Sequence, residues 1–382
     1  MENDKECMRL SSIFSTFDHF MSLSYKRIVI KIGSNVLTQD NGLPDLARIA
    51  HLVDQISAIK KQGKEVIVVS SGAVASGRSV LTVPDKFDSV ATRQLFAAIG
   101  QVKLINTYSE LFEKHELVCA QVLVTKEDFR DRLHYLNMKN CFSILFQNNV
   151  IPIVNENDVI SVTELMFTDN DELAGLIASM LNADALIILS NVNGIYNGDP
   201  KDASSKVIEE IGGSVTGFSS FITTQKSQFG RGGMMTKSHM AQKVARLGIA
   251  VHIANGKTED VLLKLLKKEV INTRFVPQKN ASNKKRWIAH SENNAKGIVK
   301  INEGAKLALT SSKATSLLPV GVVQVLQDFQ KGDVIKLVDE NDKLVGLGVA
   351  EYGSDKAQER LGQKKQRPIV HYDYLFLNPE IA

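Results

Sequence analysis

The sequence predicts an α/β fold: a mostly parallel sheet sandwiched by helices, followed by a small β-barrel-like module. First, the leading two-thirds of the 382 residues alternates short apolar segments with longer segments of helical periodicity. Second, the short segments are apolar throughout, which is typical of parallel strands covered on both faces. Third, short alternating runs separated by turn residues follow a polar stretch at 277–285.

The expected strands of the first part are short and rich in β-branched residues, and a glycine follows several of the helices between them. The expected strands are 27–32, 65–70, 117–124, 150–154, 185–189 and 249–253. The expected helices are 46–62, 90–113, 135–147, 172–181, 234–247 and a segment ending near 268. In such a sheet, ligands bind beyond the carboxyl ends of the strands, so the candidate site residues are sought there.

The last part of the chain predicts a separate β-module of about 90 residues, a plausible size for an appended domain. Its expected strands are 297–301, 307–309, 322–325, 334–338, 344–350 and 369–371. The predicted organisation is an N-terminal extension at 1–24, a first domain at 25–275, a linker at 276–288 and the module at 289–382.

The first 24 residues predict a poorly ordered extension. Glu2, Asp4 and Glu6 give the chain an acidic start, and no long apolar stretch follows, which argues against a secretory signal. A short amphipathic helix carrying Phe14, Phe17 and Phe20 is one alternative, and a start of translation at Met21 is another.

Composition places the chain among soluble globular proteins. Its formal net charge is +4, with 43% hydrophobic and 23% charged residues, which fits an anionic small ligand and is too weak for a nucleic-acid-binding tail. Cys7, Cys119 and Cys141 lack CxxC spacing, so no disulfide framework or structural zinc site is expected. We expect a reduced cytoplasmic protein, and no apolar run is long enough to span a membrane.

The segment Gly230 to Lys237 is the clearest candidate for an anion-binding loop. Its three glycines allow the backbone to approach an anion closely, and the start of a helix directly follows. Lys237 lies in the first helical turn, where a cation opposes the helix dipole unless an anion lies beside it. The alternative is a flexible loop whose lysine points into water.

Lys31 interrupts an apolar strand, and Gly33 with Ser34 follows at the carboxyl end. A lysine there can place its ammonium group in the ligand crevice. The alternative is an edge-strand lysine whose stem packs on apolar surface. The adjacent Gly-Ser turn favours the functional interpretation.

Two further strands end in polar or small residues. Ser71 follows the strand 65–70 and leads into small residues that permit close ligand approach, although it can also cap a helix. Asn155 and Asp158 belong to a polar cluster after the strand 150–154, where they can bind an amino group and a carboxylate. A solvated turn is the alternative for this cluster.

The Asp169-Asn170-Asp171 segment opens a helix. One aspartate is explained as an N-cap, and the other could orient lysines or bind Mg²⁺. Ser190 and Asn191 follow another strand and, taken alone, indicate only a loop. The sequence lacks a GxxxxGK[ST] loop and the protein-kinase HRD and DFG motifs, which disfavours those phosphoryl-transfer classes.

Taken in order, these segments resemble the amino acid kinase family, and within it the glutamate 5-kinases. The similar segments include KIGSNVLT, VSSGAVASG, RQLFAAIGQ, NENDV, DNDELAG, GIYNGDP and GRGGMMTK. The last third, with RWI, SLLPVGV and FQKGDVIKL, resembles the PUA domain appended to many bacterial members.

The resemblance implies the amino acid kinase fold and ATP-dependent phosphorylation of the 5-carboxylate of L-glutamate to L-glutamyl 5-phosphate. This reaction is the first step of proline biosynthesis, and proline is the expected inhibitor. Mg²⁺ is expected to arrive with ATP. The chain is expected to form a homo-oligomer, either a dimer or a tetramer.

The resemblance also implies roles for individual residues. The implied catalytic residues are Lys31, Lys237 and Asp171. The implied glutamate-binding residues are Ser71, Asn155, Asp158 and Asn170. The implied ATP-binding residues are Lys31, Gly33, Ser34, Ser190, Asn191, Arg231, Gly232, Gly233, Met234, Met235, Thr236 and Lys237.

Two alternatives stay open. One is a related kinase that phosphorylates another acid or phosphate. The other is an RNA-binding protein that acts through the β-module, which has 15 Lys and Arg against 12 Asp and Glu from residue 284 onward. That balance disfavours RNA, because binding the phosphate backbone needs clustered cations.

Overall fold

The computed structural model describes residues 23–82, 89–160, 167, 169–200, 202, 204–212, 233–278, 288, 295–311 and 315–378. They fall into two compact units, one within residues 1–128 and 135–279 and the other within residues 129–134 and 280–382. Among the described residues, no helix is long and apolar enough to cross a membrane. The predicted N-terminal extension at 1–24 lies almost entirely outside the described residues.

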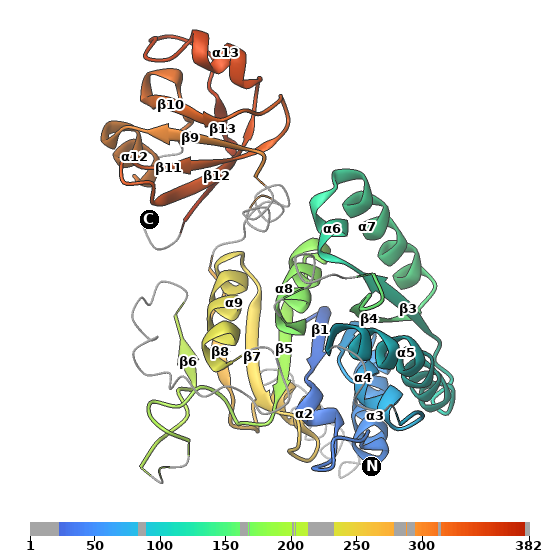
Figure 1. Ribbon diagram of the computed structural model, residues 1–382. Helices are drawn as coiled ribbons and strands as arrows, with labels where there is room; N and C mark the ends of the chain where they lie inside the picture. The colour runs from blue at the N-terminus through green and yellow to red at the C-terminus, as the bar shows by residue number, and fades with distance from the viewer. Residues whose placement is uncertain are drawn as a thin grey trace, which may run out of the picture. The chain divides into compact units, whose positions relative to one another are not determined.

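The described strands of the first unit form an eight-stranded sheet in the order β3-β4-β2-β1-β5-β7-β8-β6 (Figure 1). All pairs are parallel except β7 with β8. The strands are β1 Arg27–Ile32, β2 Glu65–Ser70, β3 Cys119–Val124, β4 Ile151–Glu156, β5 Ala185–Ser190, β6 Glu210–Ile211, β7 Ala250–Asn255 and β8 Thr273–Phe275. The predicted α/β fold with a mostly parallel sheet is therefore confirmed.

The predicted helices between the strands are present, and three shorter helices at 34–37, 73–78 and 126–130 were not predicted. The helices of this unit are α2 Ser34–Leu37, α3 Leu46–Lys61, α4 Ala73–Arg78, α5 Ser89–Glu113, α6 Lys126–Arg130, α7 Arg132–Gln147, α8 Asn170–Leu181, α9 Met234–Arg246 and α10 Val261–Leu266. Helix α3 begins where the side chain of Asp45 accepts a hydrogen bond from the Arg48 N–H, which is ordinary N-capping.

The two faces of β1 contact different helices. Ile28, Ile30 and Ile32 are buried in a core that also contains residues of α3, α5 and α10. Because successive side chains of a strand point to opposite faces, Lys31 lies on the other face, where it contacts α8. Since β1 lies between β2 and β5, the edge-strand alternative for Lys31 is wrong.

Helices α4 and α5 cross at two glycines. A Cβ atom at Gly77 would overlap the backbone of Phe96, and one at Gly100 would overlap the backbone of Ala73. The two helix backbones therefore touch, which holds α5 close to α4, the helix that follows Ser71.

The second unit contains a five-stranded sheet in the order β10-β9-β11-β12-β13, in which only β9 with β11 is parallel. Its strands are β9 Gly297–Ile301, β10 Val322–Gln327, β11 Val334–Val338, β12 Leu344–Ala350 and β13 Val370–Leu377. Its helical segments are α12 Glu303–Thr310, η3 Pro319–Gly321 and α13 Ser354–Glu359.

One predicted strand of this unit is wrong, because residues 307–309 belong to α12. The Asn302 side chain caps this helix by accepting a hydrogen bond from the Ala305 N–H. Leu309 is buried and Leu307 is exposed, so the apolar side chains follow the helix surface rather than one face of a strand. A run of three residues is too short for periodicity to separate the two structures.

Candidate active site

The polar segments predicted from the sequence meet at one edge of the first sheet. Strands β1, β2, β4, β5 and β7 are parallel, so their carboxyl ends share an edge. Lys31, Ser71, Asn155 and Ser190 lie at or just beyond these ends. The N-terminus of α8 reaches the same edge and contacts side chains from β1, from β4 and from the turn after β2.

Lys31, Asp171 and Lys237 form a buried ion triad. Nζ of Lys31 lies 2.6 Å from Oδ1 of Asp171, and Nζ of Lys237 lies 2.7 Å from Oδ2. The Asp171 side chain is fully buried, whereas the Lys31 and Lys237 side chains are 6% and 13% exposed. The carboxylate therefore holds two ammonium groups, from β1 and α9, at fixed positions.

Electrostatics favours the charged forms of Asp171 and Lys237. Burial acts to raise the pKa of the Asp171 carboxyl, but the two lysines more than offset this, and its pKa lies below the ordinary value. Burial acts to lower the pKa of Lys237, but Asp171 outweighs it, and that pKa is raised. The triad carries two positive charges against one negative charge, so it can stabilise an anion beside it.

Asp169 has the structural role predicted for one aspartate of its segment. Its Oδ1 accepts hydrogen bonds from the N–H groups of Asp171 and Glu172, each at 3.0 Å, and so caps α8. Burial and the nearby Asp171 charge raise the pKa of Asp169. The cap directs Asn170 and Asp171 to different neighbours.

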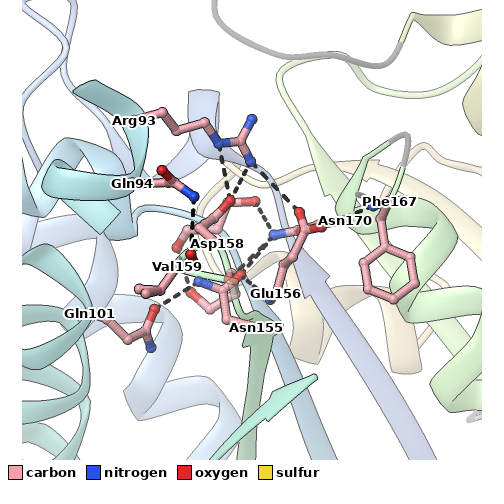
Figure 2. Close-up of polar contacts among 11 residues, drawn as sticks. Arg93, Gln94, Gln101, Asn155, Glu156, Asp158, Val159, Phe167 and Asn170 are labelled. Atoms are coloured by element: carbon pink, nitrogen blue, oxygen red, sulfur yellow. Dashed lines mark hydrogen bonds and ion pairs between the residues drawn. The ribbon is translucent and has the colours of Figure 1, made fainter. Parts of the chain in front are cut away.

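Asn170 is the centre of an amide network, shown in Figure 2. Its Nδ2 donates to Oγ of Ser71 at 2.9 Å and to Oδ1 of Asn155 at 3.2 Å. Asn155 in turn donates to Oε1 of Gln101 at 2.9 Å. The hydroxyl of Ser71 therefore contacts this network rather than capping α4, whose N-cap is Gly72 without a side-chain cap.

Asp158 extends the same network toward α5. It accepts hydrogen bonds on Oδ1 from Nε and Nη2 of Arg93, at 3.0 and 2.6 Å (Figure 2). Nη2 of Arg93 also lies 3.7 Å from Oε2 of Glu156, and Oε1 of Glu156 accepts from the Phe167 N–H at 2.9 Å. All four residues predicted to bind glutamate, the phosphoryl acceptor, therefore lie in one polar cluster, the acceptor cluster: Ser71, Asn155, Asp158 and Asn170.

Gly33 allows a ligand to approach the backbone closely beside the triad. A Cβ atom there would lie 3.4 Å from Nζ of Lys31 and 3.2 Å from the Leu189 carbonyl oxygen. Ser34 begins α2 directly after it. The backbone at this turn is therefore next to the Lys31 ammonium group, as a phosphate contact requires.

Some of the other residues predicted to bind ATP lie among the described residues, and the rest lie outside them. Ser190 ends β5 and lies beside Asn255 of β7, with Asn191 next in the chain. Gly233 is the N-cap of α9, whose first residues are Met234, Met235, Thr236 and Lys237. Gly230, Arg231 and Gly232 lie outside the described residues.

The structure adds residues that sequence reasoning did not select. Arg93, Gln101 and Tyr108 all come from α5, and Glu156 comes from β4. Tyr108 is fully buried and shares a 2.9 Å hydrogen bond with Ser70, beside the Ser71 turn. The α5 residues are spaced eight and seven positions apart, which places them near one helix face, and this spacing is the signal that could have found them.

Two family models match the chain. Residues 26–255 match the model for the amino acid kinase family, and residues 297–372 match the model for the PUA domain. The match to the first model contains the triad residues Lys31, Asp171 and Lys237.

Several relatives are similar over almost the whole chain. A protein named Glutamate 5-kinase from Bacteroides thetaiotaomicron is 53% identical over 360 residues, which is 94% of this chain and 100% of that protein. One of the same name from Chlorobaculum tepidum is 51% identical over 93% of this chain and 98% of its own length. A third, from Nitrosospira multiformis, is 37% identical over 92% and 98%.

Proposed function

The chain is a kinase that belongs to the amino acid kinase family, and on this premise we propose that it phosphorylates the 5-carboxylate of L-glutamate with ATP. One observation carries the proposal: a single buried carboxylate, Asp171, holds two lysines from different elements next to an amide-lined acceptor cluster. The names of the relatives that cover more than nine-tenths of the chain support glutamate as the acceptor.

The reaction needs little from the protein besides positioning and charge. The side-chain carboxylate of glutamate has an ordinary pKa near 4.3, so at pH 7 it is already a nucleophile. Its oxygen forms a bond to the terminal phosphorus of ATP, the bond from that phosphorus to the bridging oxygen breaks, and ADP leaves with the electron pair. No general base is required, and we assign none.

The triad supplies the charge that this step needs. Lys31 and Lys237 would contact the transferring phosphoryl group and its leaving oxygen from two sides, where negative charge is redistributed in the transition state. Asp171 is a positioning residue, because it fixes both ammonium groups. Fixing them in advance avoids reorganisation during the reaction.

The acceptor cluster would hold the amino-acid end of glutamate. Ser71, Asn155 and Asn170 offer amide and hydroxyl groups, and Asp158 offers a carboxylate for an ammonium group. Asn170 and Asp171 are neighbours on the capped end of α8. The N-cap of α8 therefore positions both Asn170, which would contact glutamate, and Asp171, which orients the lysines.

The nucleotide would lie across the ends of β1, β5 and α9. We assign it Gly33, Ser34, Ser190 and Asn191, together with the segment from Arg231 to Lys237. Both oxygens of Asp171 are occupied by lysines, so this carboxylate does not fit a resident magnesium ligand. Mg²⁺ is therefore treated as part of the MgATP substrate, and no step is assigned to a metal held by the protein.

The proposal is tested with a panel of acceptors. ADP release is measured with L-glutamate, N-acetyl-L-glutamate, carbamate and UMP, and hydroxylamine traps any acyl phosphate as a hydroxamate. We expect hydroxamate in a one-to-one ratio to ADP with L-glutamate alone. Activity with another member of the panel and none with L-glutamate would move the chain to a related kinase.

The finer assignments are part of the same proposal. We propose that the product enters proline biosynthesis, that proline inhibits the enzyme, and that a homo-oligomer works in the cytoplasm. The resemblance of the motifs to the family supports these assignments. Adding proline to the trapping assay tests the inhibition, and light scattering of the full chain measures the oligomeric state.

A further inference from the structure

Arg93 lies at the acceptor cluster in a geometry that suits a ligand carboxylate. It projects from the first turns of α5 and donates both Nε and Nη2 to the same oxygen of Asp158 (Figure 2). A guanidinium group that meets a carboxylate in its preferred way uses two parallel hydrogen bonds to two oxygens. The contact with Asp158 is therefore not the best that this fork can make.

The exposure of the pair is unequal. The side chain of Arg93 is 28% exposed, whereas that of Asp158 is 8% exposed. The guanidinium group has five N–H donors, and only those on Nε and Nη2 donate to Asp158 in the described part of the chain. A ligand can therefore approach the guanidinium group while Asp158 stays in place behind it.

The position of Arg93 relative to the triad fits one end of the acceptor. Asp158 and Asn170 belong to the same polar cluster, and Asn170 directly precedes Asp171 of the triad. The carboxylate that is phosphorylated must lie at the triad, so the opposite end of the acceptor lies at the cluster. In an α-amino acid that end carries both an ammonium and a carboxylate group.

We infer that Arg93 recognises the α-carboxylate of the acceptor, while Asp158 binds its α-ammonium group. This inference rests on the proposed function and deepens it. On binding, the guanidinium fork contacts two oxygens of the substrate, and Asp158 exchanges part of its pairing with Arg93 for the incoming ammonium. Arg93 is then the residue that distinguishes an α-amino acid from the same molecule without its α-carboxylate.

The test compares L-glutamate with two analogues that each lack one charged group. 4-Aminobutyrate lacks the α-carboxylate, and glutarate lacks the α-ammonium group. Both are measured as competitive inhibitors of glutamate phosphorylation by the full-length wild type, by Arg93→Gln and by Arg93→Lys. Lys103→Gln is the matched control, because Lys103 is a cation on the same helix that bonds Ser79 instead.

Loss of a charge-assisted pair predicts that Arg93→Gln raises the KM for glutamate roughly 30-fold or more, with kcat within about three-fold. The inhibition constant of glutarate should rise in parallel, whereas that of 4-aminobutyrate should change less than about three-fold. Arg93→Lys should fall between, because it keeps the charge and loses the fork. Lys103→Gln should leave all three constants unchanged.

The alternative results are distinct. If Arg93 only holds Asp158 in place, the constants for glutamate and 4-aminobutyrate rise together, and the inference is overturned while the proposed function stands. If the wild type does not phosphorylate glutamate, both fail. Thermal unfolding of each variant shows whether Arg93→Gln folds, and Arg93→Lys gives the same comparison should it not.

Discussion

The candidate site has two ends, centred on the adjacent residues Asp171 and Asn170, and the two ends use different interactions. At one end the fully buried carboxylate of Asp171 joins two lysines in an ion triad. At the other end Asn170 joins Ser71 and Asn155 through neutral hydrogen bonds. Fixed charges suit an interaction that strengthens in the transition state. Amides suit recognition of the part of the substrate whose charge stays the same during the reaction. The comparison predicts that one end controls kcat and the other controls KM.

Removing a triad lysine should have the largest effect. Lys237→Ala removes one of the two cations proposed to contact the transferring phosphoryl group. We expect kcat to fall about 10²–10³-fold, by analogy with the loss of one preorganised donor, and KM for glutamate to change less than about three-fold. Steady-state kinetics in the trapping assay measures both, with the exposed Lys267→Ala as control. A change confined to KM would contradict the role of Lys237.

Removing the side-chain amide of Asn170 should affect the KM for glutamate more than kcat. Asn170→Ala deletes the donor to Ser71 and Asn155 and, with it, the amide proposed to contact glutamate. The KM for glutamate should rise about ten-fold or more, because a buried polar group left unpaired costs about 1–3 kcal/mol. We expect kcat to change less. Asn148→Ala, which removes an exposed amide at the end of α7, should leave both constants unchanged.

A smaller effect is expected for Tyr108, which bonds Ser70 next to Ser71 of the acceptor cluster. Tyr108 is buried, and burial raises its pKa to about 12, so its hydroxyl stays protonated and bonded to Ser70. Tyr108→Phe removes one hydrogen bond worth about 1 kcal/mol. The Tm should fall by about 2–4 °C, and KM should rise a few-fold. Tyr372→Phe in the second unit serves as control, and an equal rise in its KM would show that the effect is not local.

The smallest expected effect is that of pH. Asp171 has its pKa lowered from 3.8, so its contribution to stability is present above that value and is lost as pH falls through the lower folded pKa. Lys237 has its pKa raised from 10.5, so its contribution is present below 10.5 and is lost as pH rises through the higher folded pKa. Between pH 6 and 9 Asp171 and Lys237 keep their charges, and kcat should vary less than about two-fold. A bell-shaped profile in this range would reveal a titrating group that the triad does not contain.

The part of the site that the sequence predicts follows from strand ends. Lys31, Ser71 and Asn155 each lie at or directly after an apolar strand, and parallel strands bring their carboxyl ends together without further information. The helix start at Asp169 was equally visible, because an aspartate before a helical pattern is an ordinary cap. These positions are local properties of the chain combined with one rule of topology.

The residues that were missed depend on how a helix lies over the sheet. Arg93, which was missed, and Asp158, which was predicted, are 65 positions apart, and α5 is held against α4 by the close contacts at Gly77 and Gly100. Periodicity predicts that α5 exists but not which of its faces covers the Ser71 turn. The wrong strand at 307–309 has a different cause, because three residues carry too little pattern to exclude a helix.

Glutamate affinity, measured by calorimetry with a non-hydrolysable ATP analogue present, tests the division of the site most directly. It separates binding from chemistry, which steady-state constants combine. The division predicts that Lys237→Ala binds glutamate within about three-fold of the wild-type affinity and that Asn170→Ala binds it about ten-fold or more weakly. Equal losses of affinity in the two variants would contradict it, because the two ends of the site would then act as one.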